Sequence, residues 1–231
     1  MKRIGIIFAM REELDELLKE VSIIRETTVF DVTFYECNIN DNYCFLAESG
    51  VGKVNSSRVA QLMIDKMNPD YIINAGVAGS ISKNVFVNDI VIGTKMVEHD
   101  FDITAFNHEK GFIPGIGVYI NNSSELIDIC SSLKEKDTHF GVIASADKFM
   151  TDKKECEEIS NNFDALCVEM EGASISQVCY LCAVPCLVIR SISDSIYKGN
   201  NKETYDELLE ESSKKICEYL LKIIRRIKWK Y

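Results

Sequence analysis

Runs of apolar residues alternate along the chain with segments in which apolar residues recur every three or four positions. The runs are typical of strands buried on both faces, and the periodic segments are typical of amphipathic helices. The expected strands span residues 3–9, 43–48, 70–75, 139–144, 165–168 and 185–192, and the expected helices span 11–21, 54–67, 125–134, 153–161, 172–182 and 202 to the end. Strands that alternate with helices predict an α/β fold with a mostly parallel sheet.

Further β-rich segments modify this prediction. Residues 27–39 alternate well enough for one strand or for two strands with a turn, and residues 87–96 fit a strand interrupted at Gly93. These additions favour a mixed sheet with antiparallel parts. Residues 98–117 show little periodicity, which predicts a long loop. Because the sequence contains no linker, repeat or low-complexity tract, we expect one domain over residues 1–231.

The stretch ALCVEMEGAS at residues 165–174 combines a buried strand with two acids and a helix start. Glu169 and Glu171 are two positions apart, so in extended backbone they point to the same side. One interpretation is a pair of salt-bridged or helix-capping acids. The other is a ligand-binding site, because a carboxylate accepts hydrogen bonds from two hydroxyl groups such as those of a ribose.

Two glycine-rich segments, at residues 50–52 and 76–79, are predicted to be turns between a strand and a helix. The first fails the P-loop pattern, because Ala47 and Val54 stand where glycine and Ser or Thr are required. It also fails the dinucleotide fingerprint at Asn55. Each turn would let the backbone approach a ligand at a strand end, or would be a tight turn without a ligand.

Charge and composition exclude several classes of partner. The formal net charge of −10 disfavours binding to nucleic acid or to an anionic membrane. The N-terminal apolar run ends by Met10, which is too short for a signal peptide or a membrane span, so we expect a cytoplasmic protein. Nine cysteines, an odd number in largely apolar surroundings, indicate buried reduced thiols, and the Cys179–Cys182 pair indicates core packing. The three histidines lack metal-ligand spacing, so we expect no metal.

Acidic residues follow several of the expected strands, where open α/β sheets bind their ligands. They are Glu12, Glu13, Glu48, Glu169, Glu171 and Asp194. Such a set suits chemistry in which one acid protonates a leaving group while another activates water. Phe149 follows the strand 139–144 and would either stack on a flat base or pack in the core.

These residues lie in segments that resemble a known family. The segments are IGIIFAMREE (4–13), SGVGKVNS (49–56), INAGVAGS (73–80), EHDFDITAF (98–106), GFIPG (111–115), SADKFM (145–150), VEMEGAS (168–174) and RSISDS (190–195). They resemble the 5′-methylthioadenosine/S-adenosylhomocysteine nucleosidases of the purine nucleoside phosphorylase-like superfamily. The resemblance implies a three-layer α/β/α sandwich with a mixed central sheet, a homodimer, no cofactor, and hydrolysis of the bond between adenine N9 and ribose C1′.

The resemblance also implies catalytic roles by position. Asp194 would protonate adenine N7, and Glu13 would orient and activate the attacking water. Asp194 would therefore hold a proton far above an unperturbed pKa of about 3.9, which a dry site and acids such as Glu171 would favour. Glu171, ionised, would bind the ribose hydroxyls and stabilise the cationic sugar. Val77 stands where serine is frequent and removes one hydroxyl near the water.

The remaining implied roles concern substrate binding. Phe149 would stack on adenine, backbone atoms of Phe149 and Met150 would contact its edge, and Ser193 would position Asp194. The sugar and its 5′ substituent would be contacted by Met10, Met170 and Tyr205 and, from the partner subunit, by Ile103, Phe106 and Pro114. Phe8, where glycine is usual, would crowd the pocket near Met10.

Several functions stay open beside hydrolysis of 5′-methylthioadenosine and S-adenosylhomocysteine to adenine and the corresponding thioribose sugar. The substrate could include 5′-deoxyadenosine, or it could be aminodeoxyfutalosine. A related phosphorylase would use phosphate as the nucleophile, but Glu13 would repel that anion. A nucleoside-binding protein without turnover is a third alternative, which the presence of Glu13, Glu171 and Asp194 disfavours.

Overall fold

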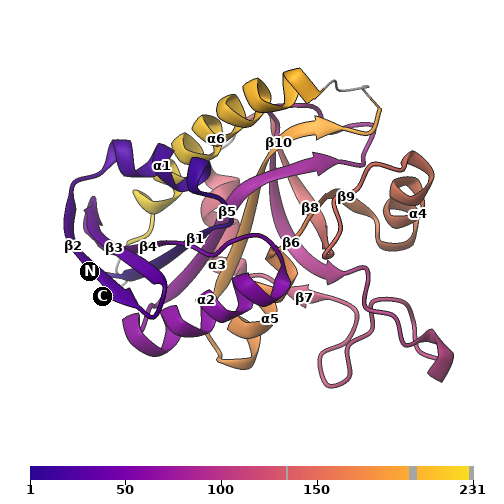
Figure 1. The fold of residues 1–231 in the computed structure, drawn as a ribbon, viewed down its shortest axis with the longest axis horizontal. Helices are drawn as coiled ribbons and strands as arrows, with labels where there is room; N and C mark the ends of the chain where they lie inside the picture. The colour runs from indigo at the N-terminus through magenta and orange to yellow at the C-terminus, as the bar shows by residue number, and fades with distance from the viewer. Residues whose placement is uncertain (134, 198–201, 229–231) are drawn as a thin grey trace.

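The computed structural model describes residues 1–133, 135–197 and 202–228, the side chains of 202–207 excepted, and Figure 1 shows its elements. The helices are α1 (Arg11–Glu20), α2 (Lys53–Met67), α3 (Ser124–Ser132), α4 (Lys153–Phe163), α5 (Gly172–Leu181) and α6 (Lys202–Ile224), with a short 3-10 helix, η1 (Thr104–Phe106). The strands are β1 (Arg3–Phe8), β2 (Ile23–Val29), β3 (Val32–Ile39), β4 (Asn42–Glu48), β5 (Tyr71–Ser80), β6 (Ile90–Glu98), β7 (Ile120–Asn121), β8 (Thr138–Ser145), β9 (Ala165–Glu169) and β10 (Cys186–Ser195).

The strands form one sheet in the order β10-β6-β8-β9-β5-β1-β4-β3-β2, with β7 beside β6. β1 runs parallel to β4 and β5, whereas β3 is antiparallel to β2 and β4. β10 pairs with β5 as well as with β6, so β5, β10, β6, β8 and β9 form a closed ring. The predicted mixed sheet is confirmed, and its closure brings the last residues of β5, β9 and β10 together.

Alternation along β1 distributes its side chains between two cores, because successive Cβ atoms of a strand point to opposite faces. Ile4 and Ile6 join the core that includes residues of α1, α3 and α6, whereas Ile7 joins the core that includes residues of α2 and α5. In Figure 1, α1 and α6 lie on one side of the sheet and α2 and α5 on the other. This is the expected three-layer α/β/α arrangement.

Phe8 is fully buried in the core beneath α1 and α6. The expectation that it crowds the pocket near Met10 is therefore wrong. The reason is the alternation of β1, which places Phe8 on the same face as Ile4 and Ile6.

The glycine-rich segment 76–79 is also different from its prediction as a turn before a helix. β5 continues through it to Ser80, in parallel register with β10. Pairing with a neighbouring strand keeps these residues extended, although their composition is typical of a turn. The segment 50–52 does form the predicted turn, with Gly50 and Gly52 at φ 79° and 97° before α2.

The C-terminal helix, predicted to reach the end of the chain, stops at Ile224. The side-chain amide of Asn42 donates hydrogen bonds of 3.0 Å to the carbonyls of Ile224 and Ile227. This amide thus binds the carbonyl of the last helical residue and one carbonyl just beyond it, where the helix no longer supplies the usual N–H partners.

All nine cysteines are free thiols, and all but Cys182 are buried, which agrees with the predicted core packing. Cys179 lies inside α5 and Cys182 at its C-terminal cap. Within the described ranges, no helix combines the length and the apolar character that crossing a membrane requires.

Candidate active site

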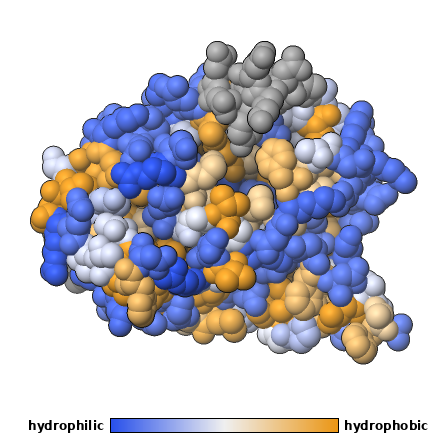
Figure 2. Space-filling model, viewed as in Figure 1, coloured by the Kyte–Doolittle hydropathy of each residue, from blue (hydrophilic) through white to orange (hydrophobic). Residues whose placement is uncertain are grey.

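A pocket of about 240 Å³ lies where β1, β5, β9 and β10 end. It is lined by Ala9, Met10, Glu13, Val51, Val77, Ala78, Gly79, Lys148, Phe149, Met150, Val168, Glu169, Met170, Glu171, Ser193 and Asp194. In Figure 2, hydrophobic residues border a hollow near the centre of the visible face, and further hydrophobic groups lie at its left and lower edges among hydrophilic residues. A more open groove of about 760 Å³ between α1 and α6 is lined by Glu12, one of the acids that follow the expected strands, but by none of the described residues expected to act in catalysis or substrate binding.

The pocket unites most of the residues that the sequence singles out. They are Met10, Glu13, Val77, Phe149, Met150, Glu169, Met170, Glu171, Ser193 and Asp194. Ile103, Phe106 and Pro114 do not line it; they lie in the segment between β6 and β7, and Phe106 is 76% exposed. Tyr205 lies in α6, but its side chain is outside the described part of the chain.

Glu13 is buried in the first turn of α1, 1% exposed. Its Oε2 accepts hydrogen bonds of 3.1 Å from the N–H groups of Ala9 and Met10, and its Oε1 accepts one of 2.9 Å from the N–H of Val77. Burial raises the pKa of this carboxyl, while the charge of Arg190 and the three N–H groups oppose the rise. Val77 thus contributes to the site through its backbone.

Two glycines of β5 leave room for two acids. A Cβ atom on Gly76 would lie 2.7 Å from Oε1 of Glu13, and one on Gly79 would lie 3.1 Å from Oδ2 of Asp194. Distances below 3 Å between a Cβ and a neighbouring heavy atom require one of them to move. The glycines therefore allow close approach of the carboxylates to an extended strand, rather than a turn before a helix.

Asp194 lies near the end of β10, where the pairing with β5 is irregular. The hydroxyl of Ser193 donates a hydrogen bond of 2.8 Å to its Oδ1. Burial raises the pKa of Asp194, and the bond from Ser193 opposes the rise. The direction agrees with a proton donor, and its cause is the expected desolvation, whereas the expected repulsion by Glu171 is not among the causes.

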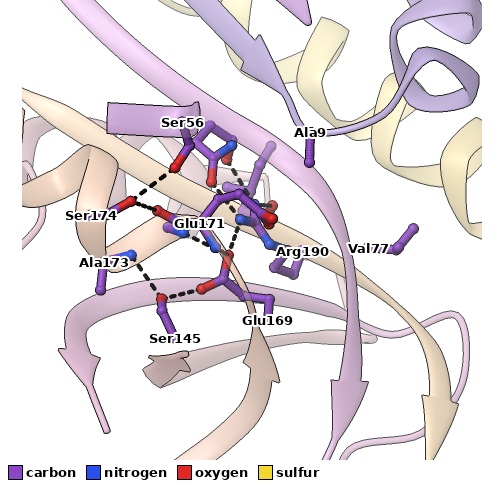
Figure 3. A network of polar contacts seen from close by, with 12 residues as sticks. Ala9, Ser56, Val77, Ser145, Glu169, Glu171, Ala173, Ser174 and Arg190 are labelled. Atoms are coloured by element: carbon purple, nitrogen blue, oxygen red, sulfur yellow. Dashed lines mark hydrogen bonds and ion pairs between the residues drawn. The ribbon is translucent and has the colours of Figure 1, made fainter. Parts of the chain in front are cut away.

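Glu169 is the salt-bridged, helix-capping acid of the first interpretation (Figure 3). Its Oε2 pairs with the guanidinium of Arg190 and accepts the N–H groups of Glu171 and Gly172 at 3.1 and 2.7 Å. Its Oε1 accepts the hydroxyl of Ser145. Both oxygens are engaged by the protein, which leaves Glu169 little capacity to bind a ligand.

Glu171 has a different environment, and it does not continue the extended backbone of β9. It is the N-terminal cap of α5, with ψ −38°, so the extended backbone assumed in the prediction ends before it, although both acids line the same pocket. Its Oε1 accepts the N–H of Gly52 at 2.8 Å. Burial and the charge of Glu169 raise the pKa of Glu171 to about 7. The carboxyl is therefore only partly ionised at neutral pH, which differs from the expected ionised form.

The first turns of α2 and α5 meet beneath Glu171. The hydroxyls of Ser56 and Ser174 are 2.9 Å apart, and Ser174 donates to the carbonyl of Glu171 (Figure 3). These contacts fix the distance between the helix that carries Glu171 and the turn that carries Gly52.

Phe149 is 59% exposed at the pocket, next to buried Met150. The alternative that Phe149 packs in the core is therefore wrong. An aromatic face at the rim of a pocket that also holds carboxylates suits a flat, nitrogen-rich ligand.

The family to which this architecture belongs is decided by comparison over nearly the whole chain. The family model of the phosphorylase superfamily matches residues 3–227. The chain belongs to the phosphorylase superfamily.

Individual members of the superfamily resemble the chain over their full length. A 5′-methylthioadenosine/S-adenosylhomocysteine nucleosidase of Exiguobacterium sp. is 36% identical over 97% of this chain and 98% of its own. An aminodeoxyfutalosine nucleosidase of Helicobacter pylori is 34% identical over 97% and 99% of the two chains. The crystal structure of a mutant Helicobacter pylori MTAN with 5′-methylthioadenosine in its active site matches with a TM-score of 0.93 and 33% identity, covering 98% of this chain and all of the other. The expected relationship to the nucleosidases is confirmed.

Two residues that hold pocket side chains of this phosphorylase-superfamily member, without lining the pocket themselves, were not among the candidates. Gly52 holds Glu171, and Arg190 pairs with Glu169 at 1% exposure. Arg190 had a signal in the sequence, since an arginine inside the apolar run 185–192 requires a buried acidic partner. Across the residues whose positions are described, no cluster of three or more His, Cys, Asp or Glu side chains could hold a metal ion.

Proposed function

We propose that this protein hydrolyses the N-glycosidic bond of 5′-methylthioadenosine and S-adenosylhomocysteine, releasing adenine and the corresponding thioribose sugar. The observation that carries the proposal is the juxtaposition of Glu13, Glu171 and Asp194 in one pocket with the exposed ring of Phe149. Full-length relatives that are nucleosidases support the reaction class.

Asp194 acts as the general acid. Departure of adenine leaves negative charge on the base unless N7 receives a proton, and a carboxyl whose pKa is raised by burial can supply one. Ser193 fixes the direction of that carboxyl through its bond to Oδ1. The base stacks on Phe149, with backbone atoms of Phe149 and Met150 at its edge.

Glu13 orients the attacking water and accepts its proton. Three N–H donors hold its two oxygens in place, so its orientation does not depend on the substrate. Glu171 binds the ribose hydroxyls, and Met10 and Met170 contact the sugar. A nucleoside that displaces water from this pocket also strengthens each of these electrostatic interactions.

Water, rather than phosphate, is the nucleophile. Among the described lining residues, Lys148 is the basic one, and its ammonium binds Glu155 on α4 at 2.8 Å. The buried guanidinium of Arg190 is committed to Glu169. A phosphate dianion would therefore meet Glu13 and the partly ionised Glu171 with little positive charge to balance its own.

Aminodeoxyfutalosine is a second candidate substrate. The Helicobacter pylori relative of that name is 34% identical to this chain. Both candidates share the adenine and ribose groups that the described pocket would bind, and they differ in the 5′ substituent. The side chain of Tyr205 and the partner's loop would contact that substituent.

A homodimer completes the proposed site. The segment between β6 and β7 extends away from the sheet at the lower right of Figure 1, and Phe106 is mostly exposed there. We propose that Ile103, Phe106 and Pro114 close the pocket of the partner subunit. The single sheet supports one domain over residues 1–231, and nine free cysteines support a reducing, cytoplasmic location.

The proposal is tested by incubating purified protein with 5′-methylthioadenosine, S-adenosylhomocysteine, 5′-deoxyadenosine or aminodeoxyfutalosine, with and without phosphate. We expect adenine and a free sugar, at a rate that phosphate does not change. A sugar 1-phosphate, or a requirement for phosphate, would assign the protein to the phosphorylases instead. Binding without adenine release would favour a non-catalytic nucleoside-binding protein.

A further inference from the structure

Lys53, the first residue of α2, forms a closed ring of polar contacts with Asp100 and Asp147, and Glu98 joins this ring as a second partner of Lys53. The ammonium of Lys53 binds Oδ1 of Asp100 at 2.7 Å and Oε2 of Glu98 at 3.0 Å. The other oxygen of Asp100 accepts the N–H of Asp147 at 3.1 Å. The ring closes where Oδ1 of Asp147 accepts the N–H of Lys53 at 2.8 Å.

The side of this ring that holds Lys53 and Glu98 is shielded from water, whereas Asp147 is exposed. The side chains of Lys53 and Glu98 are 18% and 10% exposed, and that of Asp100 is 34% exposed. Burial lowers the pKa of Lys53, but hydrogen bonds to Asp100 and Glu98 outweigh it and the pKa is raised. Lys53 therefore stays protonated and links the two acids. Removal of its charge would leave the buried carboxylate of Glu98 without its ionic partner.

The ring connects two parts of the candidate pocket. Gly52, directly before Lys53, donates its N–H to Glu171. Asp147 comes two residues before Phe149, at the rim. A Cβ atom on Gly52 would lie 3.1 Å from Oδ1 of Asp147, so the two segments approach each other closely here. The φ angle of Gly52 is +97°, a conformation that favours glycine.

We propose that Lys53 is a positioning residue for the nucleoside pocket. By closing the ring through Asp100 and Asp147, it keeps the N–H of Gly52 on Glu171 and keeps the segment that carries Phe149 beside it. Glu171 and Phe149 would contact different parts of one ligand, the sugar and the base. Lys53 therefore sets the distance between two ligand contacts without touching the ligand, an inference that rests on the proposed function.

The test compares Lys53→Met with Lys53→Arg. In Lys53→Met we expect KM for 5′-methylthioadenosine to rise about tenfold, the value of one charged hydrogen bond, with a smaller change in kcat. The acid limb of the kcat/KM profile should move to higher pH, because the bond from Gly52 favours the ionised form of Glu171. Lys53→Arg keeps the charge and should restore most of both properties.

Lys222→Met is the matched control, since Lys222 binds Glu135 at 2.6 Å, also between separate elements, and neither residue lines the pocket. It should leave KM and the acid limb unchanged. A folded Lys53→Met variant with the wild-type KM and acid limb would overturn the proposal. Should Lys53→Met fail to fold, Asp100→Asn, at a more exposed site, must shift KM in the same direction, and no shift there would be equally decisive.

Adenosine binding, measured by calorimetry, separates this proposal from the proposed function. Failure of the wild-type protein to release adenine would refute the proposed reaction alone. About tenfold weaker binding of adenosine to Lys53→Met than to wild type would still support the positioning role. Equal affinities would refute it, whether or not the protein turns over a nucleoside.

Discussion

Gly76 and Glu13 approach each other so closely that a single added carbon would not fit between them. An ideal Cβ on Gly76 would lie 2.7 Å from Oε1 of Glu13, the same oxygen that accepts the N–H of Val77. The absence of a side chain on one strand thus permits the position of an acid on a helix, 63 residues away in the chain. This contact, more than any turn, explains glycine at this position of β5.

Substitution of Gly76 by alanine should lower activity by displacing Glu13. We expect kcat to fall about 10²-fold, the effect of a misplacement of about 1 Å at an active site. Gly79→Ala, where the added Cβ would have 3.1 Å to Oδ2 of Asp194, should cost less. Steady-state kinetics of the two variants would test this, and a Gly76→Ala enzyme that is as active as Gly79→Ala would contradict it.

Replacement of Asp194 by asparagine should abolish proton donation while preserving nucleoside binding. We expect kcat to fall by about 10²- to 10⁴-fold, the typical value of general acid catalysis. In the wild-type enzyme, kcat/KM should decline as the pH rises through the raised pKa of Asp194, because the proton is then lost. Ser193→Ala removes a hydrogen bond that lowers the pKa of Asp194. The alkaline limb of the kcat/KM profile should therefore move to higher pH. Adenine release by Asp194→Asn within a few-fold of wild type would disprove the assignment.

Glu13→Gln should be inactive for a reason that the hydrogen bonds make specific. Both oxygens of Glu13 accept N–H groups, whereas glutamine must place its NH₂ against at least one of those donors. The side chain loses its basic oxygen and its orientation together, so we expect kcat to fall by at least about 10²-fold. Single-turnover assays would measure the chemical step directly. A variant that hydrolyses substrate at the wild-type rate would exclude Glu13 as the base.

In protein without added nucleoside, the ionisation of Glu171 should lower the free energy of unfolding as the pH rises from about 4.5 to about 7. Its pKa is raised from 4.5 to about 7 on folding, so the folded state binds the proton more tightly than the unfolded state does. The resulting stabilisation is complete below the unfolded pKa and is lost as the pH rises through the folded pKa, by up to about 3 kcal/mol. Urea unfolding of the wild type and Glu171→Gln across this range would measure the difference. Parallel curves for the two proteins would contradict the raised pKa.

Phe106→Ala should weaken substrate binding without changing the chemistry of the pocket in its own chain. The ring is 76% exposed and lies outside that pocket, so an effect on KM would have to pass through a partner subunit. We expect KM to rise about tenfold, because the loss of an apolar contact with the substrate costs about 1–2 kcal/mol of binding free energy. Sedimentation should show a dimer, and a fully active monomer at assay concentrations would refute the shared site.

The sequence by itself determined the alternation of strands and helices, the mixed sheet and the acids that follow the strands. These properties depend on local periodicity, and the cap that Glu13 makes for Ala9 and Met10 spans only three or four residues. The site residues lie at the ends of β1, β5, β8, β9 and β10 or directly after them, and the apolar runs of these strands are visible in the sequence. The roles assigned to them came from the family resemblance rather than from these patterns.

The tertiary structure decided how the acids differ. Local pattern treats Glu169 and Glu171 alike, but Arg190 engages one and Gly52 the other, from 21 and 119 residues away in the chain. Contacts with a distant segment also made residues 76–79 a strand, because pairing with β10 determines their backbone conformation. Contacts between such distant segments form only when the sheet closes and the helices pack on it. Burial, and with it the raised pKa values of Glu13, Glu171 and Asp194, exists only in that packed state.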